Sequence, residues 1–179
     1  MEKFYRKSIG IFGGSFDPPH YGHLKISKIA LKKFKFERIF WAVTKKNPFK
    51  KKPYFSLKDR LQKSKEISRG INNIKVVHLD KKLKSSRTIK LVKYFLKKIP
   101  NRNIFLILGS DNLIGFHKWQ SYKEIVKNCR LIVFPRKGFD KKAKKSVIIK
   151  VLGRKNILFI KNAKIDISST KIRINYKKN

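Results

Sequence analysis

The 179-residue chain has one cysteine, few acidic residues and no long apolar run. A lone cysteine, Cys129, excludes a disulfide framework within the chain, so we expect a reducing compartment and a cytoplasmic protein. No stretch reaches the ~20 apolar residues that a membrane helix needs. The opening MEKFYRKSIGIFGG shows no signal-peptide pattern, and we expect no membrane partner.

Acidic side chains are scarce, since 10 Asp and Glu stand against 48 Lys and Arg, for a formal net charge of +38. One interpretation is a nucleic acid or another polyanion as partner. The other is a general enrichment of lysine on solvated faces. The lysines are spread through all segments without a nucleic-acid-binding motif, which favours the second. A basic nucleic-acid-binding protein stays the alternative from a different functional class.

Apolar patterning predicts alternating strands and helices within one domain spanning residues 1–179, with 41% apolar residues to form a core. Strands are expected at 8–12, 38–44, 74–79, 104–109, 130–134 and 156–160. Helices are expected at 23–36, 57–67, 88–99 and 141–151, and after Ser169. Such alternation predicts an α/β fold with a Rossmann-like, doubly wound, mostly parallel sheet and helices on both faces.

Small and polar residues gather where the predicted strands end, which is where open parallel sheets bind ligands. The clusters are Gly13 to His23, Asn47 to Lys50 and Gly109 to Asp111, with a fourth in ISSTKIR (167–173) at the last helix. Small residues let backbone N–H groups approach a phosphate closely. The GxGxxG fingerprint is absent, which argues against a dehydrogenase.

Four motifs in series resemble one enzyme family. GGSFDPPHYGH (13–23) is similar to the HxGH signature of the nucleotidylyltransferase superfamily, and ISSTKIR (167–173) resembles its second signature. GSDNLIGFHKW (109–119) is similar to the GxDxLxxFxxW segment of bacterial nicotinate-nucleotide adenylyltransferases, and VTKKNPFK (43–50) resembles their loop after the second strand. The motifs follow in the right order over nearly the whole chain.

The resemblance implies that AMP passes from ATP to nicotinate mononucleotide, giving deamido-NAD and pyrophosphate in NAD biosynthesis. It gives His23 the role of donating to the α-phosphate and His20 that of holding the ATP phosphates. A sister enzyme acting on pantetheine phosphate is the nearest alternative. Mg²⁺ is expected with ATP, held mainly by phosphates and water.

The expected ATP site combines three of the clusters. By resemblance, Asp111 accepts a hydrogen bond from a ribose hydroxyl, although it could instead cap a helix. Ser168 to Thr170 could likewise cap the last helix and leave other N–H groups free for phosphate. The expected ATP-binding residues are Gly13, Gly14, Ser15, Phe16, His20, His23, Asp111, Ser168, Ser169, Thr170 and Arg173.

The expected mononucleotide site takes Trp119 as the platform for the pyridine ring, with a core tryptophan as the alternative. Asn47 and Lys50 would approach the mononucleotide phosphate. Thr88, which could also cap a helix, and Arg87 would serve the nicotinate carboxylate. We expect His78, His117 and Cys129 to be structural.

Overall fold

The computed structural model describes residues 8–47, 52–153, 156–161, 163, 167 and 169–176. Its strands are β1 (Ser8–Gly14), β2 (Arg38–Val43), β3 (Ile74–Val77), β4 (Asn103–Gly109), β5 (Arg130–Phe134) and β6 (Ile157–Phe159). Every pairing between them is parallel, and their order in the sheet is β3-β2-β1-β4-β5-β6. The chain leaves β1 toward one edge and returns through β4 toward the other, so the doubly wound topology is confirmed and its switch point lies between these two strands.

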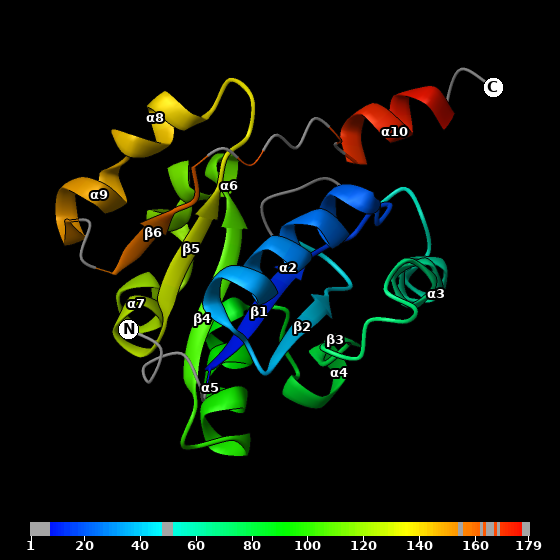
Figure 1. Cartoon of the computed structure of the whole chain (residues 1–179), viewed down its shortest axis with the longest axis horizontal. Helices are drawn as coiled ribbons and strands as arrows, with labels where there is room; N and C mark the ends of the chain where they lie inside the picture. The colour runs from blue at the N-terminus through cyan, green and yellow to red at the C-terminus, as the bar shows by residue number, and fades with distance from the viewer. Residues whose placement is uncertain are drawn as a thin grey trace.

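Helices cover both faces of this sheet (Figure 1). The helices are α2 (Tyr21–Phe34), α3 (Leu57–Ile67), α4 (Asp80–Leu83), α5 (Thr88–Lys98), α6 (Ser110–Ile114), the 3₁₀ turn η1 (Phe116–Lys118), α7 (Tyr122–Asn128), α8 (Asp140–Lys144), α9 (Val147–Leu152) and α10 (Ser169–Tyr176). Alternate strand residues face opposite sides: Ile11 belongs to the core packed by α5 and α7, and Phe12 to the core packed by α2.

The strands agree with the expected ranges to within two residues, and three of the helical predictions need correction. The helix expected at 141–151 is two short helices, α8 and α9, since a turn at Lys145 and Ser146 separates them. The first helix begins at Tyr21 rather than at His23. Arg87, not Thr88, occupies the N-cap of α5, and Thr88 is its first helical residue. Across the described ranges, none of the helices combines the length and apolarity required to cross a bilayer.

Candidate active site

Two adjoining cavities open at the carboxyl ends of the strands. The larger, of about 810 Å³, is lined by every predicted ATP-binding residue that the structure describes: Gly13, Gly14, Ser15, Phe16, His20, His23, Asp111, Ser169, Thr170 and Arg173. The smaller, of about 310 Å³, is lined by Asn47, Arg87, Thr88 and Trp119. Both cavities share the wall formed by Phe12, Gly13, Gly14 and Asn112. Ser168 and Lys50 lie outside the described residues.

His20 and His23 cap the start of α2 for each other. The Nδ1 atom of His20 accepts the Gly22 N–H at 3.1 Å, and the Nδ1 atom of His23 accepts the His20 N–H at 3.1 Å. A neutral imidazole whose Nδ1 accepts a hydrogen bond carries its proton on Nε2. The capping box therefore sets the same tautomer in both rings and makes Nε2–H the donor of each.

The charge state of His20 follows from its surroundings. Burial, followed by the positive charge of Arg136, lowers the pKa of His20 from 6.5 to about 4. Both effects disfavour the imidazolium form, so the ring is neutral at physiological pH. A neutral donor binds phosphate oxygen without a charge of its own that must be desolvated.

The loop between β1 and α2 is fixed by aromatic packing. Phe16 has a left-handed backbone with φ of 48° and is only 3% exposed. Its ring stacks on Trp41 at a centroid distance of 5.2 Å and lies 4.7 Å from the His23 ring. A nonglycine residue in this conformation is held there by its environment and is typical of functional sites. Here the packing aligns His23 with the loop backbone.

Gly13 lies beside open space and has no positive φ angle. A Cβ atom built on Gly13 would meet no atom within 4 Å. The residue lines both cavities, so any side chain would enter the volume where they join. The sequence prediction that this glycine keeps side chains out of the site agrees with this geometry.

Asp111 does not cap its helix through its side chain, because α6 has Gly109 as N-cap and no side-chain cap bond. Its Oδ2 atom instead accepts a hydrogen bond from Arg136 Nη1 at 2.6 Å. Within the described part of the chain, Asp111 Oδ1 is buried and has no hydrogen-bond partner. One carboxylate oxygen is thus paired with Arg136, and the other is enclosed against Gly109, where a Cβ atom would lie 2.4 Å from it. Sequence analysis missed Arg136, although it follows a predicted strand end.

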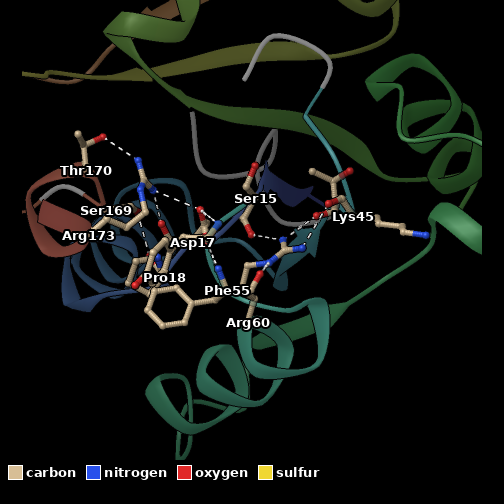
Figure 2. A network of polar contacts seen from close by, with 11 residues as sticks. Ser15, Asp17, Pro18, Lys45, Phe55, Arg60, Ser169, Thr170 and Arg173 are labelled. Atoms are coloured by element: carbon tan, nitrogen blue, oxygen red, sulfur yellow. Dashed lines mark hydrogen bonds and ion pairs between the residues drawn. The ribbon is translucent and has the colours of Figure 1, made fainter. Parts of the chain in front are cut away.

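The C-terminal helix is fastened to the loop that follows β1 (Figure 2). Ser169 Oγ donates to the Pro18 carbonyl at 2.9 Å. Arg173 donates to the Asp17 carbonyl and, at 3.4 Å, to its carboxylate Oδ2. A second nitrogen of Arg173 donates to Thr170 Oγ1 at 3.2 Å. These contacts bring the first and last predicted clusters together. Sequence analysis also missed Asp17, although it lies within the GGSFDPPHYGH motif.

The smaller cavity has an aromatic side and a polar side. Trp119 is half-buried and packs on Phe116 at a ring distance of 4.9 Å, while it also lines the cavity. Trp119 therefore lies at the edge of the core and also forms part of the cavity wall. The cavity is also lined by Asp80. The Asp80 carboxylate accepts hydrogen bonds from Thr44 Oγ1 and the Lys45 N–H. Sequence analysis missed Asp80, although it follows a predicted strand.

The three residues expected to be structural lie outside the larger cavity. His78 Nδ1 bonds to the Val43 carbonyl at 2.9 Å, and His117 forms part of η1. Cys129 is buried, and burial raises the pKa of its thiol to about 12. Such a thiol is not a nucleophile at physiological pH.

Comparison with known proteins identifies the family. The cytidylyltransferase-like family matches residues 11–175. A Pelagibacter ubique protein named "Probable nicotinate-nucleotide adenylyltransferase" is 44% identical over 94% of this chain and 93% of its own length. The chain belongs to the nicotinate-nucleotide adenylyltransferase family.

A second relative agrees, and a solved structure shares the fold. An Aquifex aeolicus protein with the same name is 33% identical over 89% of this chain and 98% of its own length. The solved Plasmodium falciparum nicotinic acid mononucleotide adenylyltransferase, complexed with NaAD, superposes with a TM-score of 0.72 at 23% identity, covering 94% of this chain and 83% of that one. Membership of an adenylyltransferase family decides for the enzyme over the nucleic-acid-binding alternative.

Proposed function

We propose that this chain transfers the adenylyl group of ATP to nicotinate mononucleotide, producing deamido-NAD (NaAD) and pyrophosphate for NAD biosynthesis. The observation that carries the proposal is the pair of cavities joined at Gly13 and Gly14, one lined by both histidines and the other by Trp119. Each cavity takes one substrate, and the reacting phosphates meet at the shared wall. The single buried cysteine is consistent with a cytoplasmic enzyme.

The reaction needs no covalent enzyme intermediate. A phosphate oxygen of the mononucleotide attacks the α-phosphorus of ATP in line and forms the new P–O bond. The bond from the α-phosphorus to the bridging oxygen breaks, and its electron pair leaves with pyrophosphate. Because nucleophile and leaving group are both present in the substrates, catalysis comes from positioning and from stabilising the charge on phosphate oxygens.

The larger cavity supplies donors for that charge. The Nε2–H group of His23 donates to the α-phosphate as charge accumulates in the transition state, and that of His20 donates to the adjoining phosphates. The backbone N–H groups of Ser15 and Phe16 contribute from the same loop. Arg173 and the start of α10, with Ser168 to Thr170, bind the β- and γ-phosphates. Asp111 accepts from a ribose hydroxyl of ATP.

The smaller cavity orients the mononucleotide. Trp119 stacks on the pyridine ring, and Asn47 and Lys50 contact the phosphate from the loop after β2. Arg87 and the N–H of Thr88 at the start of α5 favour the anionic nicotinate carboxylate over a neutral amide. This arrangement explains why the acid form of the substrate would be preferred.

Mg²⁺ fits this site as a partner of ATP rather than as a resident of the protein. The two carboxylates in the larger cavity are engaged, Asp17 with Arg173 and Asp111 with Arg136. Across the described residues, no group of three or more His, Cys, Asp or Glu side chains could hold a metal ion. Phosphates and water would supply its ligands, and the bound ion would neutralise charge on the phosphates.

The test is a panel of acceptors incubated with ATP and Mg²⁺, with pyrophosphate release as the readout. Nicotinate mononucleotide should react fastest, nicotinamide mononucleotide should react more slowly, and pantetheine phosphate should be inert. Identification of NaAD as the second product completes the assignment. Fast turnover of pantetheine phosphate with nicotinate mononucleotide inert would overturn the substrate and leave the adenylyl transfer intact.

A further inference from the structure

We infer that Arg60 on α3 is a positioning residue that fixes two loops relative to each other. These are the loop after β1 that contains Ser15, here the ATP loop, and the loop after β2 that contains Thr44 and Lys45, here the mononucleotide loop. The inference rests on the proposed function, because it concerns where the two substrates meet. Arg60 is only 2% exposed, which is rare for a charged side chain. None of the four sequence motifs includes it, and it lines neither cavity.

The guanidinium group binds backbone from three segments (Figure 2). Its Nη1 atom donates to the Ser15 carbonyl at 2.5 Å and to the Thr44 carbonyl at 2.8 Å. Its Nε donates to the Phe55 carbonyl at 3.1 Å, and its Nη2 to the Lys45 carbonyl at 3.3 Å. One nitrogen is thus shared between a residue of the larger cavity and a residue of the smaller one.

Each of these two contacts leads directly to substrate-facing groups. On the ATP side, Ser15 precedes Phe16, whose ring lies 4.7 Å from that of His23. On the mononucleotide side, Thr44 and Lys45 are also held by the Asp80 carboxylate, at 2.8 and 2.7 Å. A shift of the Ser15 and Thr44 carbonyls relative to each other would change the approach of the attacking phosphate to the α-phosphorus.

The positive charge of Arg60 is partly compensated by two carboxylates, those of Asp17 and Asp80. Burial lowers the pKa of Arg60, and the charges of Asp17 and Asp80 offset only part of that effect. Asp17 in turn accepts the N–H groups of Tyr54 and Phe55 at 2.9 Å each and receives Arg173. The network therefore extends from the mononucleotide loop to the C-terminal helix.

A lysine at this position could not reproduce the hydrogen bonds of the arginine. A guanidinium presents five N–H donors in a planar fork, whereas an ammonium is a single centre with three donors. Arg60→Lys keeps the charge and most of the volume, yet it cannot reach all four carbonyls. We expect the two loops to lose their fixed separation while each cavity keeps its own lining residues.

The experiment compares Arg60→Lys with two control variants. Ser64→Ala removes a buried hydroxyl one turn further along the same helix, where Ser64 Oγ donates to the Arg60 carbonyl at 2.7 Å. Arg102→Lys makes the same substitution in an arginine that pairs with Glu37 at the start of β4, away from both cavities. Thermal unfolding, steady-state kinetics and ligand binding are measured for wild type and all three variants.

If Arg60 is a positioning residue, Arg60→Lys should lower the rate of the two-substrate reaction while each substrate alone still binds normally. A misplacement on the order of 1 Å costs ~10²-fold in rate, so kcat of Arg60→Lys should fall by about that factor. Binding of ATP without acceptor and of nicotinate mononucleotide without ATP should each change by less than about threefold, as expected when transition-state interactions are lost. Under the proposed function, NaAD would fill both cavities at once. The affinity of Arg60→Lys for NaAD should therefore fall by about tenfold.

The alternative is that Arg60 only stabilises the fold. In that case Arg60→Lys would unfold at a lower temperature but keep the wild-type kcat at temperatures below its unfolding transition. Alternatively, Ser64→Ala would lose as much thermal stability as Arg60→Lys and show the same fall in kcat. Either result overturns the inference. So does a loss confined to the affinity for one substrate. If Arg60→Lys does not fold, Asp80→Ala loosens the Thr44 loop from its other side, and unchanged kcat and NaAD affinity there would also overturn it.

The wild-type protein separates this inference from the proposed function. Wild-type enzyme that forms NaAD while Arg60→Lys behaves like Arg102→Lys leaves the function standing and removes the role of Arg60. Wild-type protein that forms no NaAD overturns both.

Discussion

The backbone N–H of His20 donates to the ring of His23, and the ring of His20 accepts from the same helix turn at Gly22. Each histidine thus satisfies one of the N–H groups that a helix start leaves without a partner. Because both bonds use Nδ1, the two Nε2–H donors are oriented before any substrate binds. In the proposed mechanism, capping and phosphate binding would therefore use opposite sides of the same rings.

Replacing His23 tests its donor role. His23→Ala should lower kcat by ~10²-fold or more, which is the effect of removing one preorganised transition-state donor, and should weaken ATP binding much less. Steady-state kinetics and ATP titration measure the two effects. His23→Gln is the control, because glutamine at this helix position can still accept the cap hydrogen bond. Because the glutamine amide can also donate a hydrogen bond, an inactive glutamine variant would tie the role to the imidazole, whereas an unchanged kcat in folded His23→Ala would contradict the donor role.

The lowered pKa of His20 predicts how stability depends on pH. Its pKa is about 4 in the folded protein and 6.5 for a histidine in the unfolded chain, so between these values the unfolded chain binds a proton that the folded chain does not. The contribution is fully present above pH 6.5 and is lost as the pH falls toward 4. His20→Asn, which keeps an N-cap acceptor, should lose less stability over this window. Thermal unfolding without ATP compares the two proteins, and parallel curves would contradict the prediction.

Gly13→Ala should separate activity from stability. The new methyl group has room in the folded protein, and a glycine replaced at a compatible backbone position stabilises by about 0.4–1 kcal/mol. The same methyl group would enter the volume where the substrates react, so we expect a large loss of kcat with an unchanged or raised melting temperature. Gly115→Ala is the matched control, since its Cβ also meets nothing within 4 Å and the residue lines neither cavity. Equal activity in both variants would argue against reaction at the shared wall.

Trp119 should affect one substrate only. Trp119→Leu removes the stacking platform, and aromatic pairs contribute about 0.5–1.5 kcal/mol beyond area burial, so KM for nicotinate mononucleotide should rise by up to about tenfold. KM for ATP should stay the same, and Trp119→Phe should retain part of the affinity. Initial-rate kinetics with each substrate varied in turn give both constants. A Trp119→Leu enzyme that differs from wild type only in melting temperature would favour the alternative of a purely structural tryptophan.

Sequence patterns predicted the sheet well because its strands are continuous apolar runs that end at glycine or polar residues. They also located part of the lining of each cavity, since motifs such as HYGH and ISSTKIR in the larger cavity are local in the chain. The short helices α4, α6 and α7 were not predicted, because four to seven residues give too few turns for a helical period to emerge.

The residues that hold the site together were missed for a different reason. Arg60 reaches partners as far as 45 residues away, and Arg136 acts through a partner 25 residues away. In a chain with 48 Lys and Arg, no local signal distinguishes a buried arginine from an exposed one. Only the fold shows that Arg60 is enclosed and that Arg136 faces Asp111.

The contacts of α10 also bear on the order in which the protein acquires its binding capacity during synthesis. Ser169 and Pro18 are 151 residues apart, and Arg173 and Asp17 are 156 apart, yet they lie in direct contact. A ribosome must translate all six strands before the segment that completes the lining of the larger cavity exists. The sheet can therefore form on the emerging chain while the larger cavity is still incomplete. Under the proposed function, a nascent chain would gain the full stabilisation by cellular ATP only after this helix had docked.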